Sequence, residues 1–237
     1  MVAIVFDVDD TLYDQLIPFQ LAYEKNFDFT DIPIEKLFNY SRFYSDKVFN
    51  KSENGLISLD DLHIYRIQKA FNHFDKSITE EQGRNFQCDY QMNQAKIELL
   101  PEMGKALDIC SQYGVRLGII TNGPAEHQMK KIKDLKLNRW IPDDHIFISG
   151  QLGYAKPDIK LFRYVEKMMK LDTENTFFVG DSFANDIVGA KNAGWNAVWI
   201  NRRNRVISDY EASPDFIIDE KCTITQFICS LVLQGKC

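Results

Sequence analysis

Residues 2–11 read VAIVFDVDDT, a short apolar run that stops at Phe6 and passes directly into an acidic cluster with Asp7 and Asp9. The run is rich in Val, Ile and Phe and does not alternate with polar residues, which is typical of a strand buried on both faces. Parallel α/β sheets bind their ligands beyond the carboxyl ends of such strands. This stretch therefore predicts both a central strand and part of a site.

Similar apolar runs follow along the chain, and helical patterns bounded by Pro or Gly separate them. The predicted further strands are residues 115–120, 146–148, 176–179, 197–200 and 216–218. The predicted helices between them are residues 101–113, 125–135, 158–169 and 185–193. This alternation predicts an α/β fold with a parallel sheet and helices on both faces.

Residues 15–96 break this rhythm, because they show little strand signal and their apolar residues recur at helical spacing. We predict two domains: a core formed by residues 1–14 and 97–237, and an all-helical domain formed by residues 15–96. The inserted stretch is rich in aromatic residues, which are more often a core than a ligand cage. These are Phe19, Tyr23, Phe27, Phe38, Phe43, Tyr44, Phe49 and Phe74.

The totals describe an acidic globular protein. The 237 residues carry a net charge of −6, which argues against a nucleic-acid partner. The chain has no long apolar run and no secretory leader pattern, so we expect neither a membrane span nor export. Five scattered cysteines show no CxxC pair, and together with the missing leader they favour a cytoplasmic protein with reduced thiols.

Polar side chains follow three of the predicted strands: Asp7 and Asp9 after the first, Thr121 after the second, and Asp181 and Asp186 after the fourth. Residues far apart in sequence would thus meet at one edge of the sheet. Each cluster alone resembles ordinary turn chemistry, but their coincidence favours a site. Carboxylates without His or Cys suit a hard cation, and Mg²⁺ in particular.

The same residue types suit phosphoryl transfer. Asp7 is ionised at neutral pH and can attack phosphorus without a general base, while Asp9 can serve first as acid and then as base. The hydroxyl of Thr121 and the backbone amides of Asn122 and Gly123 can hold phosphoryl oxygens. Lys156 offers a compact positive charge to the same group.

Four motifs in this order resemble the haloacid dehalogenase (HAD) superfamily: residues 7–11 (DVDDT), residues 120–123 (ITNG), Lys156 before Pro157, and residues 180–186 (GDSFAND). The resemblance implies a Rossmann-like core with a small all-helical cap domain inserted after the first motif. It implies an aspartyl-phosphate on Asp7 and catalysis by Asp7, Asp9, Thr121 and Lys156. It also implies Mg²⁺ bound by Asp7, Asp181 and the backbone carbonyl of Asp9, with Asp186 supporting the metal directly or through water.

Within this family the sequence is expected to be a phosphatase with a nucleotide, phosphoglycolate or sugar phosphate as substrate. Dehalogenases resemble this chain but lack the second acid, and Asp9 is present. A phosphomutase of the β-phosphoglucomutase type shares all four motifs and stays open. A non-catalytic phosphate-binding module is disfavoured, because both Asp7 and Asp9 remain.

Substrate choice is expected to lie in the cap, since the core motifs serve the phosphoryl group and the metal. Residues 50–55 (NKSENG) look like a loop between two cap helices, and Asn54 is a candidate for specificity. Arg66 resembles an arginine in the cap of nucleotidase-like relatives, although a surface arginine fits equally well. The expected partner is a small phosphorylated metabolite, and we expect a monomer or a homodimer.

Overall fold

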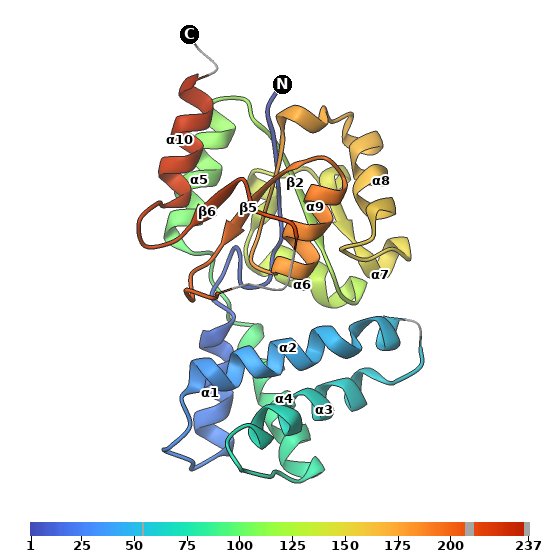
Figure 1. Ribbon diagram of the computed structural model, residues 1–237, viewed down its shortest axis with the longest axis vertical. Helices are drawn as coiled ribbons and strands as arrows, with labels where there is room; N and C mark the ends of the chain where they lie inside the picture. The colour runs from blue at the N-terminus through green and yellow to red at the C-terminus, as the bar shows by residue number, and fades with distance from the viewer. Residues whose placement is uncertain (54, 207–210, 235–237) are drawn as a thin grey trace. The chain divides into compact units, whose positions relative to one another are not determined.

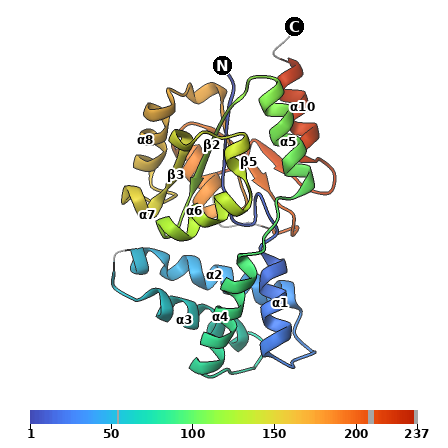
Figure 2. The ribbon, with the colours of Figure 1, turned by 180° about the vertical axis from the view of Figure 1, so that it is seen from behind.

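The computed structural model describes residues 1–53, 55–206 and 211–234. The chain divides into two compact units, one formed by Met1–Asp14 and Glu98–Cys237 and the other by Gln15–Ile97. Figures 1 and 2 show the elements of each unit from opposite sides. That the first unit is a catalytic core and the second its cap remains a prediction.

The first unit is built on a six-stranded sheet in the order β3-β2-β1-β4-β5-β6, and every neighbouring pair is parallel. Its strands are β1 (Ala3–Phe6), β2 (Arg116–Thr121), β3 (Ile146–Ile148), β4 (Thr176–Gly180), β5 (Asn196–Ile200) and β6 (Phe216–Ile218). The first strand of the chain thus lies between β2 and β4, in the middle of the sheet. The carboxyl ends of these three strands are therefore neighbours.

Helices cover both faces of this sheet, which confirms the predicted fold class. α5 and α10 lie on one face and α8 and α9 on the other (Figures 1 and 2). Under α8, the ring of Phe162 meets Phe178 and Trp195 edge-on, each at a centroid distance of 5.5 Å. The helices are α5 (Pro101–Gln112), α6 (Ala125–Asp134), α7 (Ser149–Leu152), α8 (Ile159–Met169), α9 (Val188–Asn192) and α10 (Ile224–Gln234), and short 3₁₀ turns are η1 (Leu137–Arg139), η2 (Asp143–His145) and η3 (Thr173–Asn175).

The predicted helix at residues 185–193 is wrong in its start and its type. The chain first forms a π-helical turn, η4 (Phe183–Ile187), and α9 begins only at Val188. Two hydrogen bonds between Asp186 and Ser182 hold this turn. The carboxylate of Asp186 accepts a hydrogen bond from the backbone N–H of Ser182 at 2.9 Å. The backbone N–H of Asp186 donates to the Ser182 carbonyl at 2.8 Å. Single π-helical turns of this kind are frequent at functional sites.

The second unit is all-helical, with α1 (Leu16–Asn26), α2 (Ile34–Glu53), α3 (Leu59–Asn72) and α4 (Glu80–Gln94). α3 and α4 begin at the N-caps Ser58 and Thr79, and Thr79 forms a capping box with Gln82. The core holds Phe19 at its centre, in edge-on contact with the rings of Phe38 and Phe86.

Two sequence predictions for this unit need correction. Residues 50–53 belong to the last turn of α2 rather than to a loop, and α2 ends at Glu53. Gly55 has a φ of 69°, which a helix does not accommodate. Phe43 is 48% exposed rather than part of the core, and the ammonium group of Lys47 covers its ring at 4.2 Å. None of the helices in the described residues is long and apolar enough to cross a membrane.

Candidate active site

The parallel sheet gathers Asp7, Thr121 and Asp181 from three neighbouring strand ends. Asp7 continues β1 by one residue, and its N–H donates to the carbonyl of Val179 on β4 at 2.9 Å. Thr121 is the last residue of β2, and Asp181 directly follows β4. All three side chains are buried.

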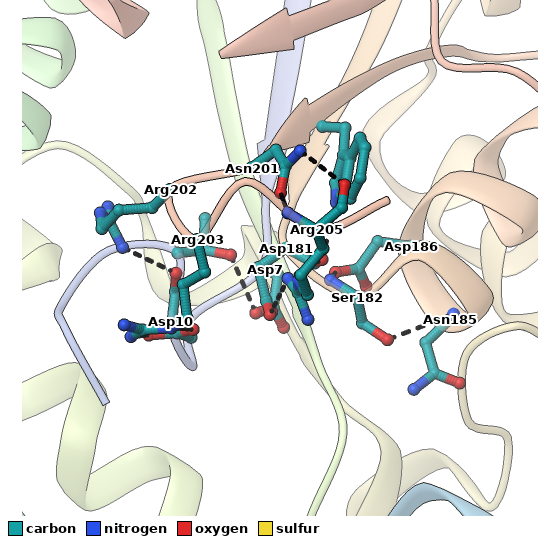
Figure 3. A network of polar contacts seen from close by, with 12 residues as sticks. Asp7, Asp10, Asp181, Ser182, Asn185, Asp186, Asn201, Arg202, Arg203 and Arg205 are labelled. Atoms are coloured by element: carbon teal, nitrogen blue, oxygen red, sulfur yellow. Dashed lines mark hydrogen bonds and ion pairs between the residues drawn. The ribbon is translucent and has the colours of Figure 1, made fainter. Parts of the chain in front are cut away.

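Asp7, Asp181 and Asp186 form a compact acidic cluster in which one carboxylate oxygen of each lies within 4.8 Å of the others. Figure 3 shows these three side chains side by side. Gly180 permits this approach, because a Cβ atom there would overlap the carboxyl group of Asp186. Three buried carboxylates so close together repel one another unless a cation joins them, so this donor set fits a hard divalent ion.

The side chain of Lys156 brings a positive charge to this cluster. Its ammonium group lies 2.7 Å from Asp7 Oδ1 and 2.7 Å from Asp186 Oδ1, and the side chain is buried. Burial alone lowers the pKa of Lys156, but the charges of Asp186 and Asp7 outweigh it and raise the pKa above its ordinary value. The lysine therefore stays charged beside the predicted nucleophile.

Burial raises the pKa of Asp7 to about 7, since the pull of Lys156 does not fully offset desolvation and the repulsion from Asp186 and Asp9. Burial likewise raises the pKa of Asp186. A nucleophilic carboxylate must be ionised, and a divalent cation among these oxygens would favour that form. The electrostatics of the cluster thus also fit a bound metal ion.

Asp9 lies next to this cluster and has its own partners. Its carboxylate accepts hydrogen bonds from the hydroxyl of Tyr13, from Gln128 Nε2 at 2.8 Å and from Lys131 Nζ at 2.6 Å. The Asp9 carboxylate is not one of the three clustered oxygens. Asp7 and Asp9 are therefore held by different groups.

Thr121 presents a hydroxyl group that is fully buried and has no hydrogen-bond partner among the described residues. An orphaned buried hydroxyl is costly unless a ligand satisfies it, which suits an oxygen of a phosphoryl group. The side chain of Asn122 and the N–H of Gly123, in contrast, already have hydrogen-bond partners within the protein. The side-chain amide of Asn122 donates to the Lys156 carbonyl and accepts from the Lys156 N–H, each at 2.9 Å. The Gly123 N–H donates to Ser149 Oγ at 2.9 Å.

Thr121→Val is expected to leave stability equal to that of wild type or to raise it by up to about 1–3 kcal/mol, because it removes a buried hydroxyl that has no protein partner. The same change should lower kcat/KM roughly 10- to 100-fold, as expected for a lost hydrogen bond to a charged group. Urea unfolding and phosphate release measure the two effects. Thr176→Val is the matched control: Thr176 is equally buried but donates to the carbonyl of Asp172 at 2.6 Å, so stability should fall while activity persists.

Three arginines after β5 lie near the acidic cluster (Figure 3). Arg205 donates to the Asp181 carbonyl at 2.7 Å and to its Oδ2 at 3.0 Å. Arg203 forms a two-pronged bond with Asp10, at 2.6 and 3.1 Å, and a further bond to Asp14 at 2.7 Å. Arg202 donates to the Asp10 carbonyl at 3.0 Å. This segment anchors the loop that carries Asp7 and Asp9.

The two residues predicted to set specificity are Arg66 and Asn54. Arg66 is buried within the helical unit, where it donates to Gln87 Oε1 at 2.9 Å and lies 5.7 Å from the ring centroid of Tyr90. Asn54 lies outside the described residues. A specificity role for either residue remains a prediction.

Sequence reasoning missed the second set of polar residues, Gln128, Lys131, Arg203 and Arg205. Charged residues on a helix or after a strand are usually solvated, so their types alone give no signal. The phase of α6 could have indicated Gln128 and Lys131, because they share a helical face with the buried Ile132.

Comparison with known proteins places these features in a family. The model of the haloacid dehalogenase-like hydrolases matches residues 1–194. The HAD-hydrolase YfnB of Bacillus subtilis is 27% identical over 84% of this chain and 83% of its own length. A glyceraldehyde 3-phosphate phosphatase of Methanothermobacter thermautotrophicus is 28% identical over 84% of this chain and 85% of its own length. The magnesium-bound crystal structure of YfnB superposes with a TM-score of 0.70 at 23% identity, covering 97% of this chain and 98% of that one.

Proposed function

This chain belongs to the haloacid dehalogenase-like hydrolase family, and on that premise we propose that it is a Mg²⁺-dependent phosphatase of a small phosphomonoester. The observation that carries the proposal is the contact of Lys156 with both Asp7 and Asp186 inside a buried cluster of three carboxylates. The glyceraldehyde 3-phosphate phosphatase among the relatives supports a small phosphorylated metabolite as substrate. A nucleotide, phosphoglycolate or a sugar phosphate fits the same chemistry.

In the first half of the reaction Asp7 Oδ attacks phosphorus, and the bond from phosphorus to the leaving oxygen breaks. Asp9 gives its proton to that oxygen, so the alcohol leaves and an aspartyl-phosphate remains on Asp7. Lys156 and the hydroxyl of Thr121 hold the phosphoryl oxygens during the transfer. Positioning and charge neutralisation of this kind supply most of the catalysis of phosphoryl transfer.

In the second half a water molecule attacks the phosphorus of the aspartyl-phosphate. The Asp9 carboxylate takes a proton from that water, the bond from phosphorus to Asp7 breaks, and inorganic phosphate leaves. Asp7, Asp181, Asp186 and the backbone carbonyl of Asp9 would hold Mg²⁺, which neutralises charge on the transferring group when bound.

Removal of divalent metal is expected to lower phosphate release from p-nitrophenyl phosphate by at least about a hundredfold, since three carboxylates would then crowd the phosphoryl group. The measurement compares protein in excess EDTA with the same protein after Mg²⁺ is restored. Full turnover in EDTA would contradict the metal dependence. If wild type releases no phosphate from any phosphomonoester but isomerises a sugar phosphate, the mutase alternative is correct.

A further inference from the structure

Two side chains of helix α6 donate hydrogen bonds to the carboxyl group of Asp9, one to each oxygen. Lys131 Nζ lies 2.6 Å from Asp9 Oδ1, and Gln128 Nε2 donates to Asp9 Oδ2 at 2.8 Å. The two residues are three positions apart and therefore project from the same face of the helix. Both are buried, and the side chain of Lys131 is 5% exposed.

The same helix begins directly after the short loop that follows Thr121. The N–H of Gln128 donates to the Pro124 carbonyl at 3.0 Å, and its side-chain amide donates to the Asn122 carbonyl at 2.9 Å as well as to Asp9. Gln128 thus ties the Asp9 carboxyl group to the loop that follows Thr121, the residue whose hydroxyl would hold the phosphoryl group. One amide group therefore bridges these two parts of the site.

Lys131 is buried, whereas the neighbouring Lys130 on α6 is exposed. Lys130 forms an ion pair with Asp134 at the protein surface, and such exposed pairs contribute little to stability. Lys131 instead gives up its hydration, which costs several kcal/mol unless a partner compensates. The partner is the carboxylate that the proposed mechanism uses twice.

We propose that Lys131 and Gln128 are the positioning residues of the acid–base group, and that they hold the Asp9 carboxyl where it meets the leaving oxygen. This inference rests on the proposed phosphatase function. Lys131 and Gln128 exchange no proton and break no bond themselves.

The test compares two substrates of nearly equal size that differ in how much their leaving oxygen needs a proton. p-Nitrophenolate leaves readily without protonation, whereas phenolate leaves poorly. In this mechanism kcat/KM reports the steps up to departure of the leaving group, so it isolates the acid role of Asp9. In the full-length protein, Lys131→Met should lower kcat/KM for phenyl phosphate at least about tenfold more than for p-nitrophenyl phosphate, because general acid catalysis contributes about 100-fold or more.

Gln128→Met should show the same pattern with a smaller effect, and it keeps the inference testable if Lys131→Met does not fold. Lys130→Met is the matched control on the exposed side of α6, and it should leave kcat/KM unchanged for both substrates. An equal loss with both substrates, or no loss in either Lys131→Met or Gln128→Met, would overturn the inference, because a merely structural contact does not distinguish leaving groups.

Asp9→Asn, measured in parallel, separates this inference from the function beneath it. If Asp9→Asn discriminates between the two substrates and the Lys131 and Gln128 variants do not, the positioning role alone is wrong. If Asp9→Asn turns over both substrates like wild type, the proposed acid–base role of Asp9 fails, and the inference fails with it.

Discussion

Asp7→Asn is expected to lower kcat by at least about a thousandfold, because a carboxamide oxygen does not form the covalent bond to phosphorus that the mechanism needs. The change is nearly isosteric and keeps an oxygen within reach of Lys156, so substrate binding should suffer less than turnover. The measurement is phosphate release from p-nitrophenyl phosphate at saturating Mg²⁺.

The stability of this variant supplies its control. Burial and the neighbouring acids raise the pKa of Asp7 to about 7, so the charged form is disfavoured in the folded state. In metal-free buffer at neutral pH, Asp7→Asn should therefore unfold at an equal or higher urea concentration than wild type. Because the unfolded carboxyl has its pKa near 3.8, the difference should shrink as the pH falls from about 7 toward 4. A folded variant with near wild-type turnover would rule out Asp7 as nucleophile.

Arg203→Met is expected to lower the free energy of unfolding of the first unit by about 3–5 kcal/mol, the cost of leaving a buried carboxylate without its partner. The side chains of Arg203 and Asp10 are 5% and 4% exposed, and three hydrogen bonds join the guanidinium to Asp10 and Asp14. Urea unfolding followed by tryptophan fluorescence isolates this unit, because Trp140, Trp195 and Trp199 all lie within it.

Two further variants show whether burial causes this loss. Adding Asp10→Asn to Arg203→Met removes the stranded charge and should restore most of the stability, and Asn tolerates the φ of 57° at this position. Arg163→Met breaks an exposed pair with Glu166 and should cost less than about 1 kcal/mol. Equal effects of Arg203→Met and Arg163→Met would show that the buried network adds no stability.

The strands of the core were predictable because burial on both faces leaves continuous apolar runs. β1, β2 and β4 begin or end within one residue of the predicted limits, and β3 and β6 coincide with them. The end of α2 was not predictable in this way, since residues 50–53 are polar in a loop and in an exposed helical turn alike. The π-helical turn η4 also escaped prediction, because its cause is the hydrogen bonding of Asp186 with Ser182 rather than a local propensity.

The acidic cluster followed from topology, since adjacent parallel strands bring Asp7 and Asp181 to one edge. Lys156 was also predicted at this site, but the groups that hold Asp9 and Asp10 were not. Lys131 meets Asp9 across 122 positions of sequence, and Arg203 meets Asp10 across 193. Which of several lysines or arginines turns inward depends on helix phase and loop path, and one sequence specifies these only through the finished packing.

Acid quenching of the Asp9→Asn protein during its reaction with p-nitrophenyl phosphate tests the central claim most directly. Without its base the variant should accumulate the intermediate, because the good leaving group departs unaided while hydrolysis is slow. After proteolysis, mass spectrometry should find one added phosphoryl group on the peptide that contains Asp7, and none when Asp7→Asn is also present. Release of p-nitrophenol with a phosphoryl group on another residue, or on no residue, would contradict an aspartyl-phosphate at Asp7.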